Sequence, residues 1–292
     1  MRPYRPAPDV TMETALPSDF PDTATLQRVL ELAAWAPSAR NSQPWRWEVD
    51  GSGLHLAADW GRAGLDSDAG RRDVLLGCGS ILNHCAVCLA AAGWQARIRR
   101  FPDDGHVASF ELIDRAPTDA VVELATAIPR RRSDRRDYAA SPLPPSTLEL
   151  LLIRAARYGV QMSVVPKLHW MRLPEGAIRL RYGGDVEDGP RPGAVDGTLL
   201  VLATETDDDT MRLRAGEALS HLLLSATVMG LASCALTEPI SDMRERLALA
   251  CELFDAEAHP QTLIRLGPTP ANAVMCPVPS RRSVAETTVW TV

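Results

Sequence analysis

The sequence contains almost no lysine: Lys167 is the single lysine among 31 basic residues. Arginine is therefore the side chain available for binding anions. The basic residues form no long stripe and the net charge is −6, so we expect no binding of nucleic acid. The sequence also has no glycine-rich nucleotide loop, P-loop or nucleophile elbow, which excludes the activities that depend on those motifs.

Long apolar runs are scarce as well. The stretch 74–94 approaches membrane-spanning length, but it contains Asn83 and His84 and therefore predicts a buried core helix rather than a membrane span. The first residues, MRPYRPAPDV, include two arginines with no apolar stretch after them, so no secretory signal is expected. A cytoplasmic location without membrane contact follows.

The six cysteines lie mostly in apolar segments, where reduced thiols pack as small hydrophobic groups. Cys85 and Cys88 have the spacing of a redox motif but lie inside the expected core helix. No second pair of cysteines or histidines has a spacing suited to zinc. We therefore expect neither a disulfide framework nor a metal site.

Hydrophobic periodicity divides the chain into two similar halves, 1–115 and 116–292. The first half is expected to contain helices near 25–36 and 71–92 and strands near 45–49, 54–58, 95–99 and 107–113. The second is expected to contain helices near 119–127, 212–229 and 242–253 and strands near 160–165, 199–204, 232–236 and 262–266. A further helix before Gly159 is expected to begin with a capping box of Ser146 and Glu149.

The two halves also match each other residue by residue. Residues of the long helices align 137 positions apart: Gly79, Leu82, His84 and Gly93 on Gly216, Leu219, His221 and Gly230. Residues of the short helices align 122 positions apart, for example Thr25 and Leu26 on Thr147 and Leu148. The difference of 15 residues is an insertion within 166–198, whose glycine, proline and charge are typical of a surface loop or lid. The pattern favours duplication into a single-chain pseudo-dimer.

One polar stretch, APSARNSQPW at 36–45, follows an apolar helix and precedes a strand. Its irregular backbone offers free N–H and C=O groups, and Asn41 and Gln43 can each donate and accept hydrogen bonds. Such a loop can pair with the edge of a planar heterocycle such as isoalloxazine. An ordinary connecting loop is the alternative.

A second motif is the basic run RRRSDRR at 130–136. In an extended segment Arg131, Ser133 and Arg135 would face one way and present two guanidinium groups and a hydroxyl. That set suits a phosphate monoester, which arginine binds through paired, charge-assisted hydrogen bonds. A solvated basic linker is the alternative.

With these two motifs the chain resembles the FMN-dependent nitroreductase superfamily and, within it, the fused Acg-like group. The resemblance covers both halves and implies an α+β, nitroreductase-like fold with mixed, mostly antiparallel sheets flanked by helices. It implies that FMN is held at its phosphate by Arg131, Ser133, Arg135, Arg281 and Arg282. It implies that the ring is approached by Pro37, Ser38, Ala39 and Asn41 from the first half and by Ala235, Leu236 and Thr237 from the segment 230–240.

The internal register predicts one FMN per chain. The positions 122 residues before Arg131, Ser133 and Arg135 hold Asp9, Thr11 and Glu13. The carboxylates of Asp9 and Glu13 would repel a phosphate. Adding 122 to Pro37, Ser38 and Asn41 leads to Gly159, Val160 and Ser163, so the second half lacks the ring motif. A fused pseudo-dimer needs no partner subunit, and we therefore expect a monomer.

The resemblance implies an oxidoreductase that passes hydride from NAD(P)H through FMN to a small acceptor. The flavin carries this chemistry, so no catalytic acid or base is expected from the protein. The alternative is a protein that sequesters or stores FMN, with little reductase activity. A lid formed by the insertion 166–198 would distinguish the two.

Overall fold

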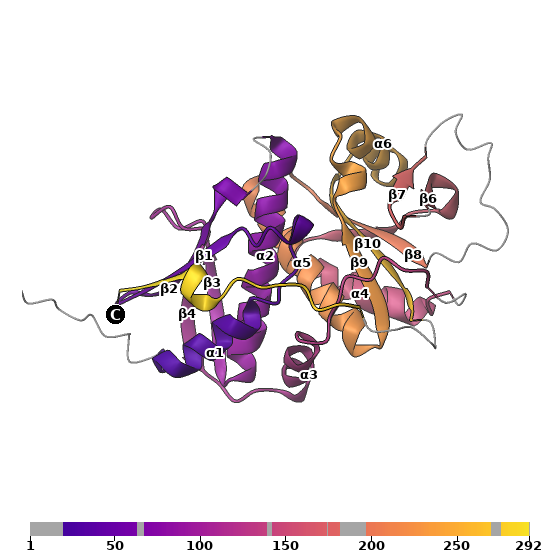
Figure 1. Cartoon of the computed structure of the whole chain (residues 1–292). Coiled ribbons are helices and arrows are strands. Elements are labelled where there is room, and N and C mark those ends of the chain that lie inside the picture. Colours follow the sequence, from indigo (N-terminus) through magenta and orange to yellow (C-terminus); the bar gives the residue numbers. More distant parts are fainter. Residues whose placement is uncertain are drawn as a thin grey trace, which may run out of the picture.

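The computed structural model describes residues 20–62, 67–138, 142–173, 175–181, 197–269 and 276–291. Two sheets lie on either side of a pair of long helices (Figure 1). The helices are α1 (Thr23–Ala33), α2 (Asp68–Ala91), α3 (Asp119–Ala127), α4 (Pro145–Ala156), α5 (Asp209–Val228), α6 (Met243–Phe254) and α7 (Val284–Thr287). The predicted α+β class is confirmed.

The first sheet has the strand order β11-β1-β2-β4-β3, and all its pairings are antiparallel except β11 with β1. Its strands are β1 (Trp45–Asp50), β2 (Gly53–Ala58), β3 (Trp94–Arg100), β4 (Ala108–Asp114) and β11 (Thr288–Trp290). Alternate residues Trp45, Trp47 and Val49 are buried, because a strand places them on one face. The predicted hairpin between β1 and β2 is confirmed.

The second sheet has the order β5-β8-β10-β9 and is antiparallel throughout. Its strands are β5 (Gln161–Val164), β8 (Thr198–Thr204), β9 (Leu231–Leu236) and β10 (His259–Pro268). A separate hairpin of β6 (Trp170–Arg172) and β7 (Ile178–Leu180) lies beyond this sheet, near α6 (Figure 1). The hairpin belongs to the insertion, and Trp170, Ile178 and Leu180 pack into the core on that side.

Helix ends follow the sequence in most places. Asp22 caps α1 by accepting a hydrogen bond from the Thr25 N–H at 2.7 Å. Gly93 and Gly230 follow α2 and α5 with φ of +93° and +74°, a conformation that favours glycine. The capping box predicted at Ser146 is wrong. Helix α4 begins one residue earlier at Pro145, whose fixed φ suits the first helical position, and no side chain caps it.

Helices α2 and α5 cross at close range between the two sheets. A Cβ on Gly79 would lie 2.0 Å from the carbonyl oxygen of Leu213, and one on Gly216 would lie 2.3 Å from that of Leu76. Leu213 follows Leu76 by the same 137 positions that separate the two glycines. Each helix therefore presents the same surface to the other, as in an isologous dimer interface, and this supports the duplication inferred from the sequence.

Polar groups also meet at this crossing. The hydroxyl of Ser220 donates to Asn83 Oδ1 at 2.8 Å and lies 2.7 Å from Nδ1 of the buried His84. Among the described helices, only α2 is long and apolar enough to span a membrane, and 83% of its apolar window is buried inside the protein. It thus has the position of a core helix, as predicted.

The last described segment returns to the first half. Strand β11 pairs in parallel with β1, with Trp47 opposite Thr288, and Val284 packs into the core beneath the first sheet. Ala125 and Ala127 of α3 also belong to that core. Both segments follow residue 115, so parts of the second half complete the sheet and the core of the first. The periodicity of the sequence did not indicate β11.

Candidate flavin site

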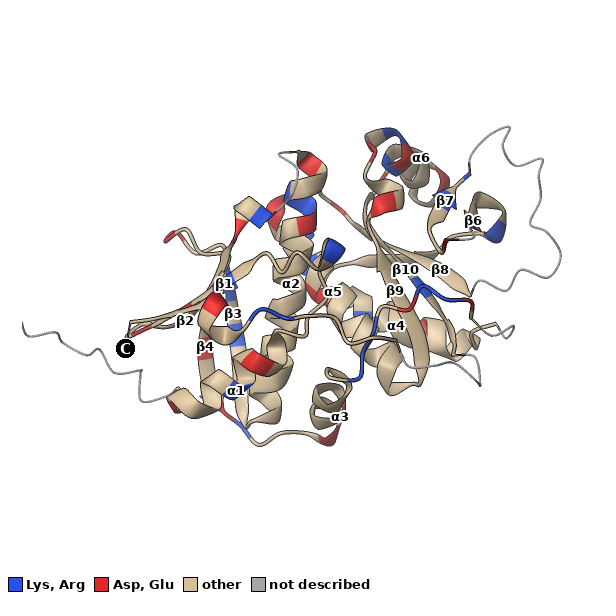
Figure 2. Cartoon of the chain, in the orientation of Figure 1, with Lys and Arg blue, Asp and Glu red and all other residues tan. Residues whose placement is uncertain are grey.

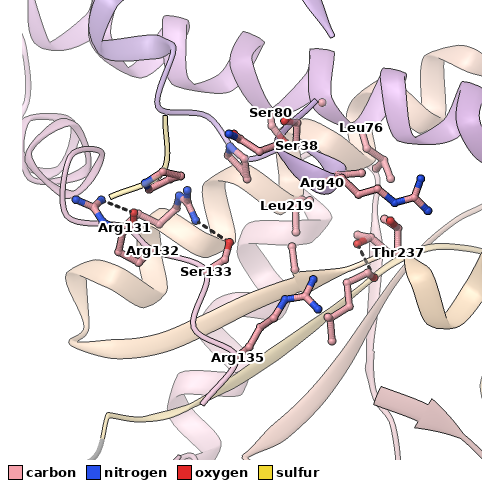
Figure 3. A pocket seen from close by; sticks show the side chains of 18 of the residues that line it. Ser38, Arg40, Leu76, Ser80, Arg131, Arg132, Ser133, Arg135, Leu219 and Thr237 are labelled. Atoms are coloured by element: carbon pink, nitrogen blue, oxygen red, sulfur yellow. Dashed lines mark hydrogen bonds between the residues drawn. The ribbon is translucent and has the colours of Figure 1, made fainter. Parts of the chain in front are cut away.

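A pocket of about 540 Å³ lies between the two halves. Residues of both halves converge on it from α2, the 36–43 loop, the basic run and β9 (Figure 3). Eleven of the twelve residues predicted for the site line it: Pro37, Ser38, Ala39, Asn41, Arg131, Ser133, Arg135, Ala235, Leu236, Thr237 and Arg281. The volume is in the range of small-molecule and cofactor sites.

Arg131 lies at one end of the pocket and is only 3% exposed. Its Nη1 is 3.5 Å from the Ser133 hydroxyl, and its buried Nε has no hydrogen-bond partner among the described residues. Burial, followed by the charges of Arg281 and Arg132, lowers the pKa of Arg131 to about 10. A buried cation repelled by two others is costly unless an anion accompanies it.

Arg132 and Arg281 complete this end of the pocket. Their guanidinium carbons lie 5.1 and 5.7 Å from the ring centre of Trp35. In the part of the chain that the structure describes, the buried Nε atom of each has no hydrogen-bond partner. Burial, followed by the charge of Arg132, lowers the pKa of Arg281 to about 10. Within the described chain, no carboxylate forms an ion pair with Arg131, Arg132 or Arg281. The cluster therefore has the composition of an anion site.

The backbone of the basic run is held against the second sheet. Figure 2 shows the run as a blue stretch beside β9. Ser133 bridges Ser233 in parallel, and the Asp134 N–H donates to the Ser233 carbonyl at 2.8 Å. Arg265, which is 1% exposed, donates from Nη2 to the carbonyls of Asp134 at 3.1 Å and Arg136 at 2.6 Å. Arg265 thus positions the motif, and no local sequence signal identifies it.

Arg135 lies apart from the other arginines. Its guanidinium points toward Thr237, away from Arg131 (Figure 3), and Nη2 is 3.1 Å from a carboxylate oxygen of Glu238. The Arg135 carbonyl accepts a hydrogen bond from Arg172 of the β6–β7 hairpin at 2.9 Å. The motif therefore divides its arginines between the two ends of the pocket, whereas the sequence placed Arg131 and Arg135 together on a phosphate.

The loop after α1 has an unusual backbone. Arg40, Asn41 and Gln43 all have positive φ, between 48° and 56°, which is costly for residues other than glycine and typical of functional sites. The Ser38 hydroxyl stabilises the loop by accepting from the Gln43 N–H at 3.0 Å. Residues 37–41 of this loop line the pocket.

The side chains of Asn41 and Gln43 bind the segment 280–282. Asn41 donates to the Ser280 carbonyl at 3.0 Å and accepts from Arg281 at 2.9 Å. Gln43 is buried and accepts from the Arg282 N–H at 2.8 Å. Both amides thus fasten the segment 280–282. These bonds use one N–H and one lone pair of the Asn41 amide, which lines the pocket and retains a second N–H and a second lone pair for contact with a ring.

Asp73 was not predicted and lines the end of the pocket where Thr237 lies. Its Oδ1 is buried without a hydrogen-bond partner among the described residues. Burial is the largest influence on the carboxyl and raises its pKa, although Thr237 and Arg72 oppose the shift. The sequence signal that could have identified Asp73 is its place as the last charged residue before the apolar run of α2. The group can accept from, or when protonated donate to, a bound ligand.

Arg282 does not line the pocket. Its Nη1 donates to the Gln43 carbonyl at 3.1 Å and its Nη2 to the Glu286 carbonyl at 2.9 Å. These bonds fasten the segment after Arg281 to the first half. Of the two arginines, only Arg281 reaches the anion end.

The pseudo-symmetric position on the other side of α2 and α5 is built differently. Gly77 and Ser80 line the pocket. Their counterparts 137 positions later in the chain are Arg214 and Glu217. Glu217 is 1% exposed and accepts two hydrogen bonds from Arg100, both at 2.8 Å. An ion pair thus stands where the pocket has small side chains. The twin ring motif is also missing, since Gly159 ends α4 and β5 follows directly.

The insertion is only partly described. Residues 166–173 and 175–181 contribute no side chain to the pocket lining, although Arg172 binds the backbone of Arg135 at its edge. The rest of the predicted lid, 182–196, lies outside the described residues, as do Asp9, Thr11 and Glu13 of the predicted twin phosphate position.

The chain is similar to proteins of Mycobacterium tuberculosis over almost its whole length. It is 38% identical to "Putative NAD(P)H nitroreductase Rv3131", with 94% of each chain covered. It is 30% identical to "Putative NAD(P)H nitroreductase acg", with 93% of this chain and 97% of that protein covered. No protein-family model matches the chain.

A solved structure shares the fold. It is described as a "putative nitroreductase" from Anabaena variabilis and has a TM-score of 0.61, with 87% of this chain and 90% of that chain covered. At 11% sequence identity this likeness concerns the fold alone. The identity to the mycobacterial proteins establishes the family. The chain belongs to the nitroreductase superfamily and, within it, to the Acg-like group.

Proposed function

We propose that the pocket binds one FMN and that the protein is an oxidoreductase that passes hydride from NAD(P)H to a small acceptor. The observation that carries the proposal is the group of three arginines at one end of the pocket. Arg131, Arg132 and Arg281 converge there without a carboxylate partner in the described chain. A phosphate monoester supplies the missing negative charge and the acceptors for their buried N–H groups.

The remaining lining fits a flavin ring. Leu76, Leu219 and Ala235 offer apolar surface, and the main chain of 37–41 offers hydrogen bonds along one edge. Arg135, beside Thr237, stands at the ring end, where a cation stabilises negative charge on a reduced flavin. We therefore assign the phosphate to Arg131, Arg132, Ser133 and Arg281, and the ring to Arg135 together with the 37–41 loop.

The bound flavin would supply the redox chemistry, accepting hydride from a nicotinamide and delivering it to the acceptor. The protein's part is to hold both ends of the cofactor and to exclude water from its phosphate end. Arg265 keeps the carbonyls of Asp134 and Arg136 in place and so fixes the spacing between Arg131 and Arg135. No residue is required to act as acid or base.

The proposed FMN site is formed by residues of a single chain. Both motifs come from the same polypeptide, and the twin position is filled by the ion pair of Arg100 and Glu217. We therefore propose one FMN per chain in a cytoplasmic monomer. Light scattering should give a mass near 31.7 kDa, and two flavins per chain would contradict this arrangement.

One observation favours the alternative of a flavin-sequestering protein. The described part of the insertion reaches the pocket edge, where Arg172 donates to the Arg135 carbonyl at 2.9 Å. Anaerobic mixing with NADPH or NADH separates the two functions. Rapid bleaching of the flavin supports the reductase, whereas bleaching by dithionite alone supports sequestration.

The FMN assignment itself is tested by flavin content. The purified protein should be yellow and contain close to one FMN per chain. The double variant Arg131→Ala/Arg135→Ala should lose the flavin while remaining folded. Arg130→Ala is the matched control, since Arg130 is exposed and binds only the Thr126 carbonyl. Stoichiometric FMN in the double variant would refute the assignment.

A further inference from the structure

A second group of ionisable side chains lies on the outer face of the first sheet, away from the pocket. Glu48, His55 and Ser109 occupy directly opposed positions on β1, β2 and β4. The loop between β3 and β4 folds over them and brings His106 onto His55, with ring centres 4.7 Å apart and planes at 27°. His55 is consequently only 8% exposed, although its strand position faces away from the core.

His106 is oriented as metal-binding histidines are. Its Nε2 lies 2.9 Å from a carboxylate oxygen of Glu48, and a carboxylate on one ring nitrogen typically fixes the other nitrogen for a metal. That other nitrogen, Nδ1, lies 2.9 Å from Asp104 Oδ1, which is an ion pair when the ring is protonated. Among the described residues Nδ1 has no aligned hydrogen bond. When the ring is neutral, the same nitrogen and carboxylate oxygen can bind a common cation instead.

His55 supplies a second nitrogen at the same place. Ser109 Oγ lies 2.9 Å from its Nδ1, and Ser52 Oγ lies 2.9 Å from its Nε2. These hydrogen bonds hold the ring in position, and a metal ion that binds one ring nitrogen replaces the hydroxyl at that nitrogen. One ligand atom each of His55, Asp104 and His106 lies within 4.8 Å of the other two.

The charge balance of the cluster also favours a divalent cation. Three carboxylates, Asp50, Glu48 and Asp104, lie within 3.6 Å of a ring nitrogen of His55 or His106. Two protonated imidazoles stacked at this distance would repel each other. A divalent metal neutralises the carboxylates while both rings remain neutral, which is the form in which histidine binds metals.

We propose that His55, Asp104 and His106 form a binding site for a divalent transition-metal ion, with Glu48 orienting His106. Two imidazoles and a carboxylate form a donor set suited to Zn²⁺. The chain supplies three ligands, so water completes the coordination. The bound ion would fasten the β3–β4 loop to the first sheet. None of these residues lines the flavin pocket, and the site does not depend on the proposed flavin function.

The test is a titration of metal-free protein with Zn²⁺ in which calorimetry measures the affinity and the number of ions bound per chain. A Cys251→Ser background removes the exposed thiol, which could bind zinc by itself. We expect one Zn²⁺ per chain. His55→Gln and His106→Gln should each weaken binding at least 30-fold. His169→Gln is the control, since His169 also contacts a carboxylate, Glu252 at 2.9 Å, but belongs to no such cluster in the described chain.

Two further measurements use protein with both histidines intact, so they test the site even if the histidine variants fail to fold. Cobalt(II) bound to the unmutated histidine site should show visible d–d bands, and Zn²⁺ should shift the imidazole nitrogen resonances of His55 and His106. Unchanged imidazole resonances at saturating Zn²⁺ would overturn the proposal. Equal zinc binding by the parent and by the His55→Gln/His106→Gln double variant would overturn it as well.

Discussion

Gly79 of α2 lies directly against Gly216 of α5: a Cβ on Gly79 would be 2.9 Å from the Cα of Gly216. The two backbones meet at this point without any side chain between them. Residues on either side of the contact, including Leu76, Ser80 and Leu219, line the pocket. The distance between the two helices therefore helps to set the width of the candidate flavin site.

The glycine contact predicts a severe effect of one added methyl group. Gly79→Ala would place its Cβ 2.0 Å from the Leu213 carbonyl, which the rigid helix cannot avoid without moving α5. We expect a loss of about 3 kcal/mol or more in the free energy of unfolding, measured by urea denaturation. Gly61→Ala is the control, because the new methyl would meet its nearest atom at 3.7 Å. Equal stability of the two variants would contradict the packing described.

Arg265 is predicted to act on the cofactor through the backbone it holds. Arg265→Met removes hydrogen bonds to two carbonyls of the basic run and the stacking of its guanidinium 4.0 Å above Tyr138. We expect a loss of about 2–4 kcal/mol in stability and weaker FMN binding, measured by flavin fluorescence. Exposed Arg99→Met should change neither quantity. An Arg265 variant that is destabilised but binds FMN with unchanged affinity would limit Arg265 to a structural role.

The two matched histidines predict a pH dependence of stability. Burial, with the charge of Arg131 next, lowers the pKa of His84 to about 3, and burial lowers the pKa of His221 to about 4. The unfolded chain takes up these protons below its ordinary pKa of 6.5, whereas the folded chain does not. Stability is therefore complete above pH 6.5 and falls as the pH approaches 4.

The expected loss at pH 5 is about 2 kcal/mol for each histidine. Urea unfolding at pH 7 and pH 5 measures it. His84→Gln and His221→Gln should each reduce the difference between the two pH values, because one protonation is removed while the carboxylates stay the same. Variants with the pH dependence of the parent would show that neither histidine is responsible.

Asp207 is predicted to be a main link between α5, α6 and β10 within the second half. It accepts from Arg212 at 2.8 Å and from Gln261 at 3.0 Å, and it pairs closely with Arg246. Asp207→Asn should cost about 3 kcal/mol, because it leaves the half-exposed Asp68 as the remaining charge partner of the buried Arg212 and Arg246. Asp209→Asn provides the comparison. Its pair with Arg71 is partly exposed and should contribute at most about 1 kcal/mol. Similar thermal midpoints for the two variants would contradict this ranking.

Much of the fold could be predicted because it depends on local patterns. The apolar stripe of α1, the alternation in β1 and the glycines after α2 and α5 each identify an element from a few neighbouring residues. Strand β11 could not be found in this way. It has three residues, and its place is decided by parallel pairing with β1, more than 200 positions earlier in the chain.

The site was predictable as a set of residues but not as an arrangement. The two motifs identify residues that the fold brings to one pocket. The separation of Arg135 from Arg131 depends on Glu238, and the engagement of Asn41 depends on Ser280 and Arg281. These partners are distant in sequence. His55 and His106 were missed for the same reason, since their strand and loop meet only in the folded sheet.

The segment 276–290 passes from the pocket to the edge of the first sheet, contributing Arg281 on the way and β11 at its end. It leaves the ribosome after all the elements it contacts. A nascent chain can therefore build both helices and most of both sheets while the anion end of its pocket is still open. If the pocket holds the proposed phosphate-bearing cofactor, its capture is a late step in biogenesis, and the same segment covers β1, a strand that would otherwise be free to pair with another chain.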